Sequence, residues 1–147
     1  MNAAPTLRRA TKLDMPGVLA LLEATKLPPD DAHSWIDFFI IAETDDGTIV
    51  GSAGLELRGD DALLRSVATH PSVRGTGIGV QLIESAIEMA RSLRLERVYL
   101  LTTSAAEWFP RFGFTRVARE EVPEAVRSSV QFSIETCSSA VAMRLML

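Results

Sequence analysis

The residues best suited to chemistry form a glycine-rich stretch, Arg74-Gly75-Thr76-Gly77-Ile78-Gly79, between a predicted strand and a predicted helix. Its three glycines remove the side chains that would block a close approach, so backbone N–H groups and the helix N-terminus can converge on an anion, while Arg74 adds charge. The GxGxG spacing matches neither a dinucleotide fingerprint nor a Walker loop. A glycine-rich packing turn is the alternative. The arginine and the helix favour a cradle for a pyrophosphate group.

Two opposite charges interrupt apolar strands. Glu56 lies late in one predicted strand, and Arg65 shares a face of the next strand with Leu63 and Val67 by period-two alternation. If the hairpin register places Glu56 opposite Arg65, the two neutralise each other, whereas a shift of one residue places them on opposite faces. The charge of Arg65 needs a partner, and either Glu56 or a substrate carboxylate can supply it.

Three further side chains are acid, base or nucleophile candidates by residue type alone. His33 and His70 have no partner close in sequence, and we expect both to be structural or exposed. Cys137 could act as a nucleophile, but the sequence places no base beside it, so a buried small hydrophobe is the better interpretation.

The composition of the chain excludes several classes of protein. The 147 residues fit one compact domain, residues 1–147, with 19 acidic and 15 basic side chains and no basic stripe of the kind that nucleic acids require. The longest apolar run, residues 38–42, is far shorter than the roughly 20 residues of a membrane-spanning helix, and the N-terminus lacks an apolar leader region. A single cysteine excludes an intramolecular disulfide and a cysteine-based zinc site, which fits a cytoplasmic location.

Hydrophobic periodicity predicts a mixed α/β chain around these residues. A helix begins at the Asp14 cap and ends at Pro28 and Pro29, and a second helix after the glycines has an apolar face that includes Leu82 and Leu93. A short helix is expected over residues 105–112. Strands are expected over residues 38–43, 49–57, 63–69, 98–103, 114–118 and 140–145. The strand–helix–strand crossover around the long helix should be right-handed and place its two strands parallel.

On two motifs, the chain resembles the GNAT superfamily of acyl-CoA-dependent N-acetyltransferases. Residues 74–79 match its Arg/Gln-x-x-Gly-x-Gly/Ala signature, and residues 108–114 are similar to its aromatic FYxxxGF segment. The order of elements from Leu7 to Ala118 also agrees. The resemblance implies a mixed central sheet that is splayed between its fourth and fifth strands and flanked by helices.

A narrower resemblance is to the arsenic-resistance N-acetyltransferases, a branch similar to glutamate and phosphinothricin acetyltransferases. It rests on Leu64-Arg65-Ser66-Val67 and on the tail from Val122-Pro123 through Arg127, Phe132 and Cys137. It implies that Arg65 clamps the carboxylate of an amino-acid substrate. Arg127 is a second candidate for that role, with a solvated surface arginine as the alternative.

The superfamily resemblance also implies how acetyl-CoA binds as co-substrate. Its pantetheine arm would run as a pseudo-strand along the backbone of Val67 and Thr69, with the pyrophosphate on residues 74–79. The backbone N–H of Val67 would stabilise the tetrahedral oxyanion. Glu56 would accept the amine proton, directly or through a water, unless it serves only as an ion-pair partner of Arg65.

One position departs from the family pattern. Phe109 stands where many members have a tyrosine that protonates the departing thiolate, and we expect it to pack against pantetheine instead. The sole tyrosine, Tyr99, is expected to be a packing residue. A thiol pKa of about 8.5 makes the thiolate a tolerable leaving group, and Thr103 or Ser104 could bind it.

The sequence therefore predicts transfer of an acetyl group from acetyl-CoA to the primary amine of a small amino acid or amino-acid-like toxin, by direct attack. The alternatives are a protein or polyamine N-acetyltransferase and a non-catalytic acyl-CoA-sensing module. The expected partner is a small-molecule amine, without nucleic acid or membrane. No metal is implied, and a homodimer is left open.

Overall fold

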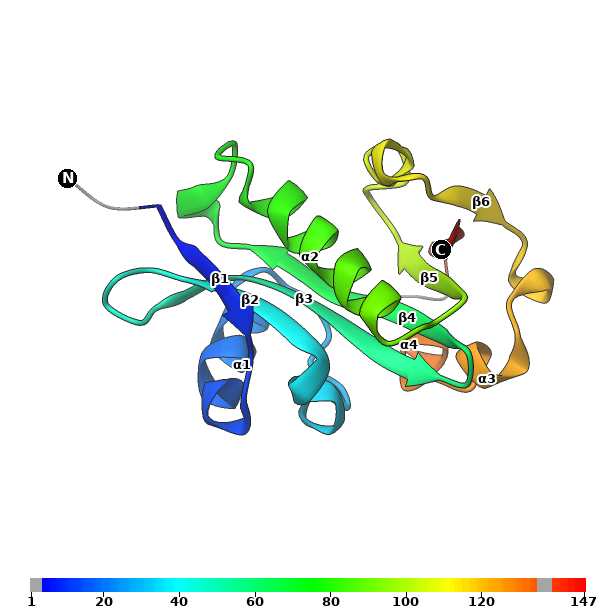
Figure 1. Cartoon of the computed structure of the whole chain (residues 1–147), viewed down its shortest axis with the longest axis horizontal. Helices are drawn as coiled ribbons and strands as arrows, with labels where there is room; N and C mark the ends of the chain where they lie inside the picture. The colour runs from blue at the N-terminus through cyan, green and yellow to red at the C-terminus, as the bar shows by residue number, and fades with distance from the viewer. Residues whose placement is uncertain (1–3, 135–138) are drawn as a thin grey trace. The chain divides into compact units, whose positions relative to one another are not determined.

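The computed structural model describes residues 4–134 and 139–147 and confirms the mixed fold class (Figure 1). Among these residues, one seven-stranded sheet has the order β1-β2-β3-β4-β5-β7-β6. The strands are β1 (Thr6–Arg9), β2 (Phe39–Glu43), β3 (Ile49–Arg58), β4 (Asp61–Thr69), β5 (Arg97–Thr102), β6 (Thr115–Val117) and β7 (Val141–Met146). The α-helices are α1 (Met15–Ala24), α2 (Ile78–Ser92), α3 (Glu124–Arg127) and α4 (Val130–Ser133). Short 3-10 helices are η1 (Lys12–Asp14), η2 (Ala32–Phe38), η3 (Pro71–Val73), η4 (Phe109–Phe112) and η5 (Arg119–Glu121).

The chain falls into two compact units. Unit 1 comprises Met1–Leu55 and Ser66–Ile87, and unit 2 comprises Glu56–Arg65 and Glu88–Leu147. Strands β3 and β4 and helix α2 each contribute residues to both units.

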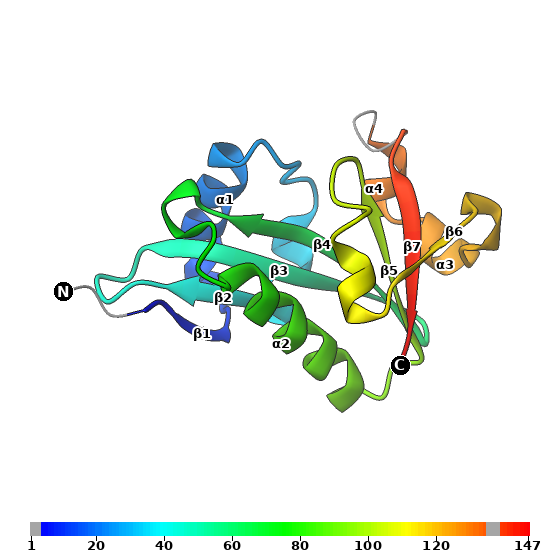
Figure 2. The ribbon, with the colours of Figure 1, turned by 90° about the horizontal axis from the view of Figure 1, so that it is seen from above.

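Unit 1 is built on the antiparallel strands β1, β2 and β3. The β1–β2 pairs run from Thr6↔Glu43 to Arg9↔Ile40, and the β2–β3 pairs begin at Phe39↔Gly54. Helix α1 and the start of α2 lie on opposite faces of β2 and β3 (Figures 1 and 2). The α1 face is apolar. Its core is made of Ala10, Val18, Leu21, Leu22, Ala32, Ile36, Phe39, Ile41 and Ala68.

Helix α2 approaches β3 closely at Gly51. A Cβ atom at this glycine would lie only 2.7 Å from a side-chain carbon of Leu82 and 3.4 Å from one of Ile78. The absence of a side chain therefore lets the first turns of α2 pack directly on the strand. This contact fixes the beginning of the helix that follows the glycine-rich stretch.

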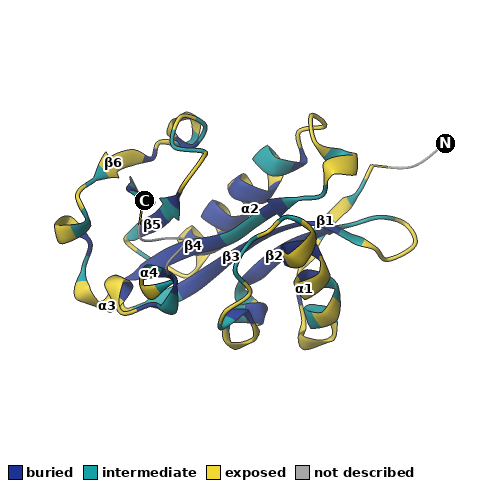
Figure 3. Ribbon diagram, turned by 180° about the vertical axis from the view of Figure 1, so that it is seen from behind, coloured by how far each residue is buried: buried dark blue, intermediate teal, exposed yellow. Residues whose placement is uncertain are grey.

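Unit 2 holds the parallel part of the sheet. Strand β4 pairs with β5 from Asp61↔Arg97 to Leu64↔Leu100, which confirms the predicted parallel crossover, and β7 pairs antiparallel with both β5 and β6. Within the described residues, the β4–β5 pairs end before either strand does, as expected for a splayed sheet. Tyr99 is 1% exposed and lies in a core cluster with Leu63, Val122, Val126 and Ala142, so its predicted packing role is confirmed. Figure 3 shows how burial concentrates in the strands.

Several predicted boundaries were wrong. Helix α1 ends at Ala24, four residues before the prolines, because Lys26 has a φ of +60° and the Leu27 N–H bonds back to the Leu22 carbonyl. Leu93 follows the end of α2 and is exposed instead of lying on its apolar face. The helix predicted over residues 105–112 is only the 3-10 turn η4, and helices α3 and α4 were not predicted because each has only four residues.

Candidate active site

The glycine-rich stretch forms an exposed loop in unit 1. It leaves η3 at Arg74 and enters α2 at Ile78, and residues 74–77 are exposed. Gly75 and Gly77 have φ angles of +80° and +86°, a left-handed conformation that side chains disfavour, and a Cβ at either would meet no atom within 4 Å. The loop therefore exposes main chain just before a 15-residue helix, and Arg74 at its start is exposed as well. This arrangement suits an anion.

His70 holds the entry to this loop. Contrary to the expectation from sequence, it has a partner two residues away: the Ser72 backbone N–H donates to Nδ1 at 3.1 Å, and the Ser72 hydroxyl lies 2.8 Å from the same nitrogen. The imidazole thus caps η3, which confirms its predicted structural role. His33 is exposed.

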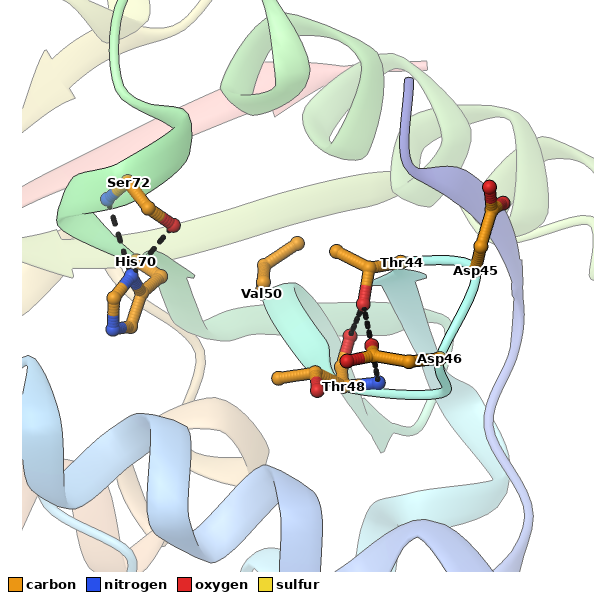
Figure 4. Close-up of a pocket in the computed structure, with 7 residues that line it drawn as sticks. All are labelled: Thr44, Asp45, Asp46, Thr48, Val50, His70 and Ser72. Atoms are coloured by element: carbon orange, nitrogen blue, oxygen red, sulfur yellow. Dashed lines mark hydrogen bonds between the residues drawn. The ribbon is translucent and has the colours of Figure 1, made fainter. Parts of the chain in front are cut away.

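A cavity of about 400 Å³ lies beside His70 (Figure 4). It is lined by Thr44, Asp45, Asp46, Thr48, Val50, His70 and Ser72, so it joins the β2–β3 turn to the start of η3. Hydrogen bonds, first from the Thr44 hydroxyl and then from Thr48, hold the pKa of Asp46 below its ordinary value. The cavity is therefore acidic, and its lining contains none of the binding or catalytic residues predicted from the sequence.

Strand β4 is kinked where the oxyanion donor was predicted. Ser66 has a φ of +54°, and its carbonyl oxygen accepts a 2.6 Å hydrogen bond from the hydroxyl of Ser52 on β3. The left-handed residue interrupts the period-two alternation on which the predicted shared face of Arg65 and Val67 depends. Arg65 is 4% exposed, whereas Val67 and Thr69 are half-buried. Neither Ser52 nor the kink was predicted, because serine in a strand carries no such signal.

Glu56 and Arg65 meet in a buried cluster within unit 2. The Glu56 side chain is fully buried, and its Oε2 accepts a 2.8 Å hydrogen bond from Nη1 of Arg65. Its Oε1 accepts hydrogen bonds from Nη2 of Arg58 at 2.6 Å and from Nε at 3.2 Å. The Ser129 hydroxyl lies 2.8 and 2.9 Å from the two carboxylate oxygens. The ion pair that the sequence left open is therefore present.

The other partners of Glu56 were missed by sequence reasoning. Arg58 lies two residues further along β3, where alternation would place it on the same face, so that signal was available. Ser129 is the N-cap of α4, where its hydroxyl accepts the Gln131 N–H at 3.2 Å. A serine before a helix signals a cap but gives no sign of a contact 73 residues away.

The remaining predicted residues are spread over unit 2. Arg127 ends α3 and is exposed. Ser104 is exposed just after β5, where Thr102 instead uses its hydroxyl to accept the Ala105 N–H at 2.9 Å. Phe109 is 5% exposed and packs edge to face against Trp108 and Phe114, with ring centroids 5.0 and 5.7 Å away.

Residues 4–134 and 139–147 give no sign of a metal site or of a membrane-spanning helix. No group of three or more histidine, cysteine, aspartate or glutamate side chains in these ranges could hold a metal ion. None of the helices found there is long and apolar enough to cross a bilayer. Cys137 lies outside the described residues.

Known proteins resemble this chain in sequence and in fold. Residues 35–116 match the family model of the acetyltransferase (GNAT) domain. The chain is 33% identical over 125 residues to an amino-acid acetyltransferase of Mycobacterium tuberculosis, covering 79% of this chain and 71% of that protein. It is 32% identical over 131 residues to the amino-acid acetyltransferase of Aeromonas salmonicida. This match covers 83% of this chain but only 29% of that longer protein.

Solved structures agree. N-acetylglutamate synthase from Neisseria gonorrhoeae, complexed with coenzyme A and N-acetyl-glutamate, superposes with a TM-score of 0.82 at 26% identity, covering 100% of this chain and 36% of that one. A Mycobacterium tuberculosis protein in complex with CoA superposes with a TM-score of 0.78 at 26% identity, covering 97% and 99% of the two chains. With the loop geometry, these matches establish that the chain belongs to the acetyltransferase (GNAT) family and is an acyl-CoA-dependent N-acetyltransferase with acetyl-CoA as its co-substrate.

Proposed function

We propose that this protein acetylates the primary amine of a small amino acid. The observation that carries the proposal is Arg65, a nearly buried arginine in an apolar strand that is held by the Glu56 carboxylate. A guanidinium that is fixed in this way is suited to bidentate binding of an acceptor carboxylate alongside its contact with Glu56. The name amino-acid acetyltransferase that is given to the curated relatives supports the same acceptor class. The narrower resemblance to arsenic-resistance enzymes stays a prediction.

Acetyl-CoA would bind mainly to the main chain. The loop from Arg74 to Gly79, in which residues 74–77 are exposed, takes the pyrophosphate, and the backbone of Val67 and Thr69 takes the pantetheine arm. Phe109 packs within an aromatic cluster in unit 2, so we propose that any contact it makes with pantetheine is apolar.

The reaction would be a direct transfer. The neutral amine attacks the thioester carbonyl, and the Val67 N–H stabilises the oxyanion as the C–N bond forms. The C–S bond then breaks, the nitrogen gives its proton to solvent water, and the departing thiolate is hydrated near Ser104 and takes up a proton from solvent. Because two arginines and a serine already surround Glu56, its contacts favour positioning Arg65 over accepting the amine proton.

The acceptor class is tested by pairing each amine with an analogue that lacks the α-carboxylate. Purified protein and acetyl-CoA are mixed with glutamate and 4-aminobutyrate, with leucine and isopentylamine, and with phosphinothricin, a polyamine and a peptide, and thiol release is followed optically. We expect release with one amino acid and about 100-fold less with its decarboxylated partner, as expected when a buried charge pair loses one member.

The variants are Arg65→Lys and, as a matched control, Arg116→Ala, which changes an exposed arginine of β6. Arg65→Lys should raise the KM for the amino acid about tenfold and leave the KM for acetyl-CoA unchanged. Equal release with the decarboxylated amines would overturn the proposed acceptor class. Release only with a polyamine or peptide would point to those substrates, and CoA binding without any release would indicate a sensor. A cytoplasmic location and a homodimer also stay predictions.

A further inference from the structure

The kink of β4 stands apart from the other strained positions in the chain. In residues 4–134 and 139–147, the non-glycine residues with positive φ are Lys26, Asp31, Ser66 and Arg94. Lys26 and Arg94 lie just after helices, and Asp31 precedes η2, where a left-handed residue commonly reverses or caps the chain. Ser66 is the member of this set that lies inside a strand. Such a conformation persists only when its surroundings impose it.

The surroundings that hold Ser66 include a buried hydroxyl. Ser52 is completely buried in the middle of β3, and its Oγ–H donates to the Ser66 carbonyl oxygen at 2.6 Å. A buried hydroxyl without a partner would be costly, and this hydrogen bond gives the Ser52 hydroxyl an acceptor. It also gives the Ser66 carbonyl oxygen a donor from β3.

The Ser66 carbonyl shares its peptide plane with the N–H of Val67. Described peptide bonds are all trans, so this N–H points in the direction opposite to the Ser66 oxygen. A hydrogen bond that fixes the carbonyl toward Ser52 fixes the Val67 N–H away from it. The same bond polarises the peptide, which strengthens the N–H as a donor.

We propose that Ser52 is a positioning residue for acetyl transfer. Its hydroxyl orients and polarises the Ser66–Val67 peptide, so that the Val67 N–H is aimed in advance at the thioester carbonyl. Preorganised donors of this kind are effective because they need no reorientation when charge develops. This inference rests on the part of the proposed function that assigns the oxyanion to Val67, and it does not depend on which amine is the acceptor.

The test compares two CoA analogues that differ in the carbonyl. S-acetonyl-CoA has a carbonyl one methylene away from the sulfur, whereas S-propyl-CoA has the same three carbons without the carbonyl oxygen, and both are titrated into the full chain by calorimetry without any amine. We expect wild-type protein to prefer S-acetonyl-CoA, and Ser52→Ala to reduce that preference about fivefold, the size of one modest hydrogen bond. The affinity for S-propyl-CoA should change less than about twofold, because the pyrophosphate loop is untouched.

Matched variants separate positioning from general stability. Ser92→Ala removes a hydroxyl that donates to the Met89 carbonyl at 2.7 Å in α2, and it should leave the preference unchanged. Ser52→Cys keeps a weaker donor at the site and provides a second test if Ser52→Ala folds poorly; its preference should be intermediate. With an active acceptor, kcat should fall about tenfold in Ser52→Ala while the KM for acetyl-CoA is retained.

The outcomes distinguish the two proposals. If wild-type protein binds neither analogue, the proposed binding of acetyl-CoA on residues 74–79 and the backbone of β4 fails. If both analogues bind and the carbonyl preference is the same in wild type, Ser52→Ala and Ser52→Cys, then Ser52 has only a structural role and this inference is overturned. An equal loss of affinity for both analogues would also overturn it.

Discussion

Replacing Glu56 with glutamine removes the charge at the centre of the buried cluster and leaves the side chain nearly the same size. The fully buried carboxylate accepts hydrogen bonds from Arg58, Arg65 and Ser129. In Glu56→Gln, the amide oxygen can keep one guanidinium contact, but the amide nitrogen is a donor and would face the N–H groups of the other guanidinium. The guanidinium of Arg65, with a side-chain exposure of 1%, then remains in the interior without its anion.

The expected cost is large for one substitution. Breaking a buried ion pair by removing one partner destabilises proteins by roughly 3–5 kcal/mol. We expect about 3 kcal/mol for Glu56→Gln, since one contact is kept and Arg58 is partly solvated, and this is a substantial share of the roughly 5–15 kcal/mol that stabilises a typical domain. Ser129→Ala should cost about 1.5–3 kcal/mol, because its hydroxyl bonds to a charged group.

Urea unfolding followed by circular dichroism measures these losses at constant m value. The double variant Glu56→Gln/Ser129→Ala should lose less than the sum of the single changes, because both remove the same contact. Exposed Glu84→Gln on α2 is the control, expected to stay within about 0.5 kcal/mol of wild type. A loss below about 1 kcal/mol for Glu56→Gln would refute the argument from burial. If that stable variant also lost nearly all activity per folded molecule, the role of Glu56 as proton acceptor would return.

Three other predictions concern the loop, the surface and the aromatic cluster. Gly77→Ala and Gly47→Ala both place alanine at a φ near +85° with open space around it, so each should lower the free energy of unfolding by about 1 kcal/mol. In calorimetry, only Gly77→Ala should weaken CoA binding. Equal CoA affinities of the two variants would argue against the pyrophosphate cradle. The Arg8 guanidinium lowers the pKa of Asp14 from 3.8 to about 2, so the folded state keeps this carboxylate ionised while the unfolded chain takes up protons. This stabilisation is complete above pH about 4 and is lost as the pH falls toward 2. In Asp14→Asn, the free energy of unfolding should therefore fall by up to about 1 kcal/mol less than in wild type over this pH range. An acid unfolding curve identical to that of wild type would contradict this. Phe109→Tyr should change kcat less than about twofold, because the leaving thiolate needs little help from an acid; an increase above about fivefold would show that its protonation limits the rate.

Local patterns were sufficient to predict most of the fold. Apolar alternation placed β2 and β3 to within one residue at each end, because these strands are buried and bounded by turn residues such as Gly47 and Gly59. The end of α1 could not be predicted from periodicity, because the chain turns at the left-handed Lys26 before the prolines are reached. The four-residue helices α3 and α4 are too short to have a period.

The candidate site could likewise be predicted only where it depends on local sequence. The glycine-rich loop could be predicted because its function depends on main-chain conformation, and glycines with positive φ are visible in the sequence. The surroundings of Glu56 could be predicted only in part, since alternation connects it with its hairpin neighbours but not with Ser129 on α4. The kink at Ser66 was not predictable because serine gains its left-handed conformation from tertiary contacts.

The contact between Glu56 and Ser129 also has a consequence for synthesis of the chain. Ser129 follows the last residue of β4, Thr69, by 60 positions, and ribosomes add about 5–20 residues per second, so the complete β3–β4 hairpin exists for roughly 3–12 s before the Ser129 hydroxyl has been made. Until then, the hairpin carries a carboxylate that is more stable in water than in an apolar interior. The nascent hairpin should therefore stay loosely packed, and its final closure should wait for synthesis of Ser129 at the start of α4.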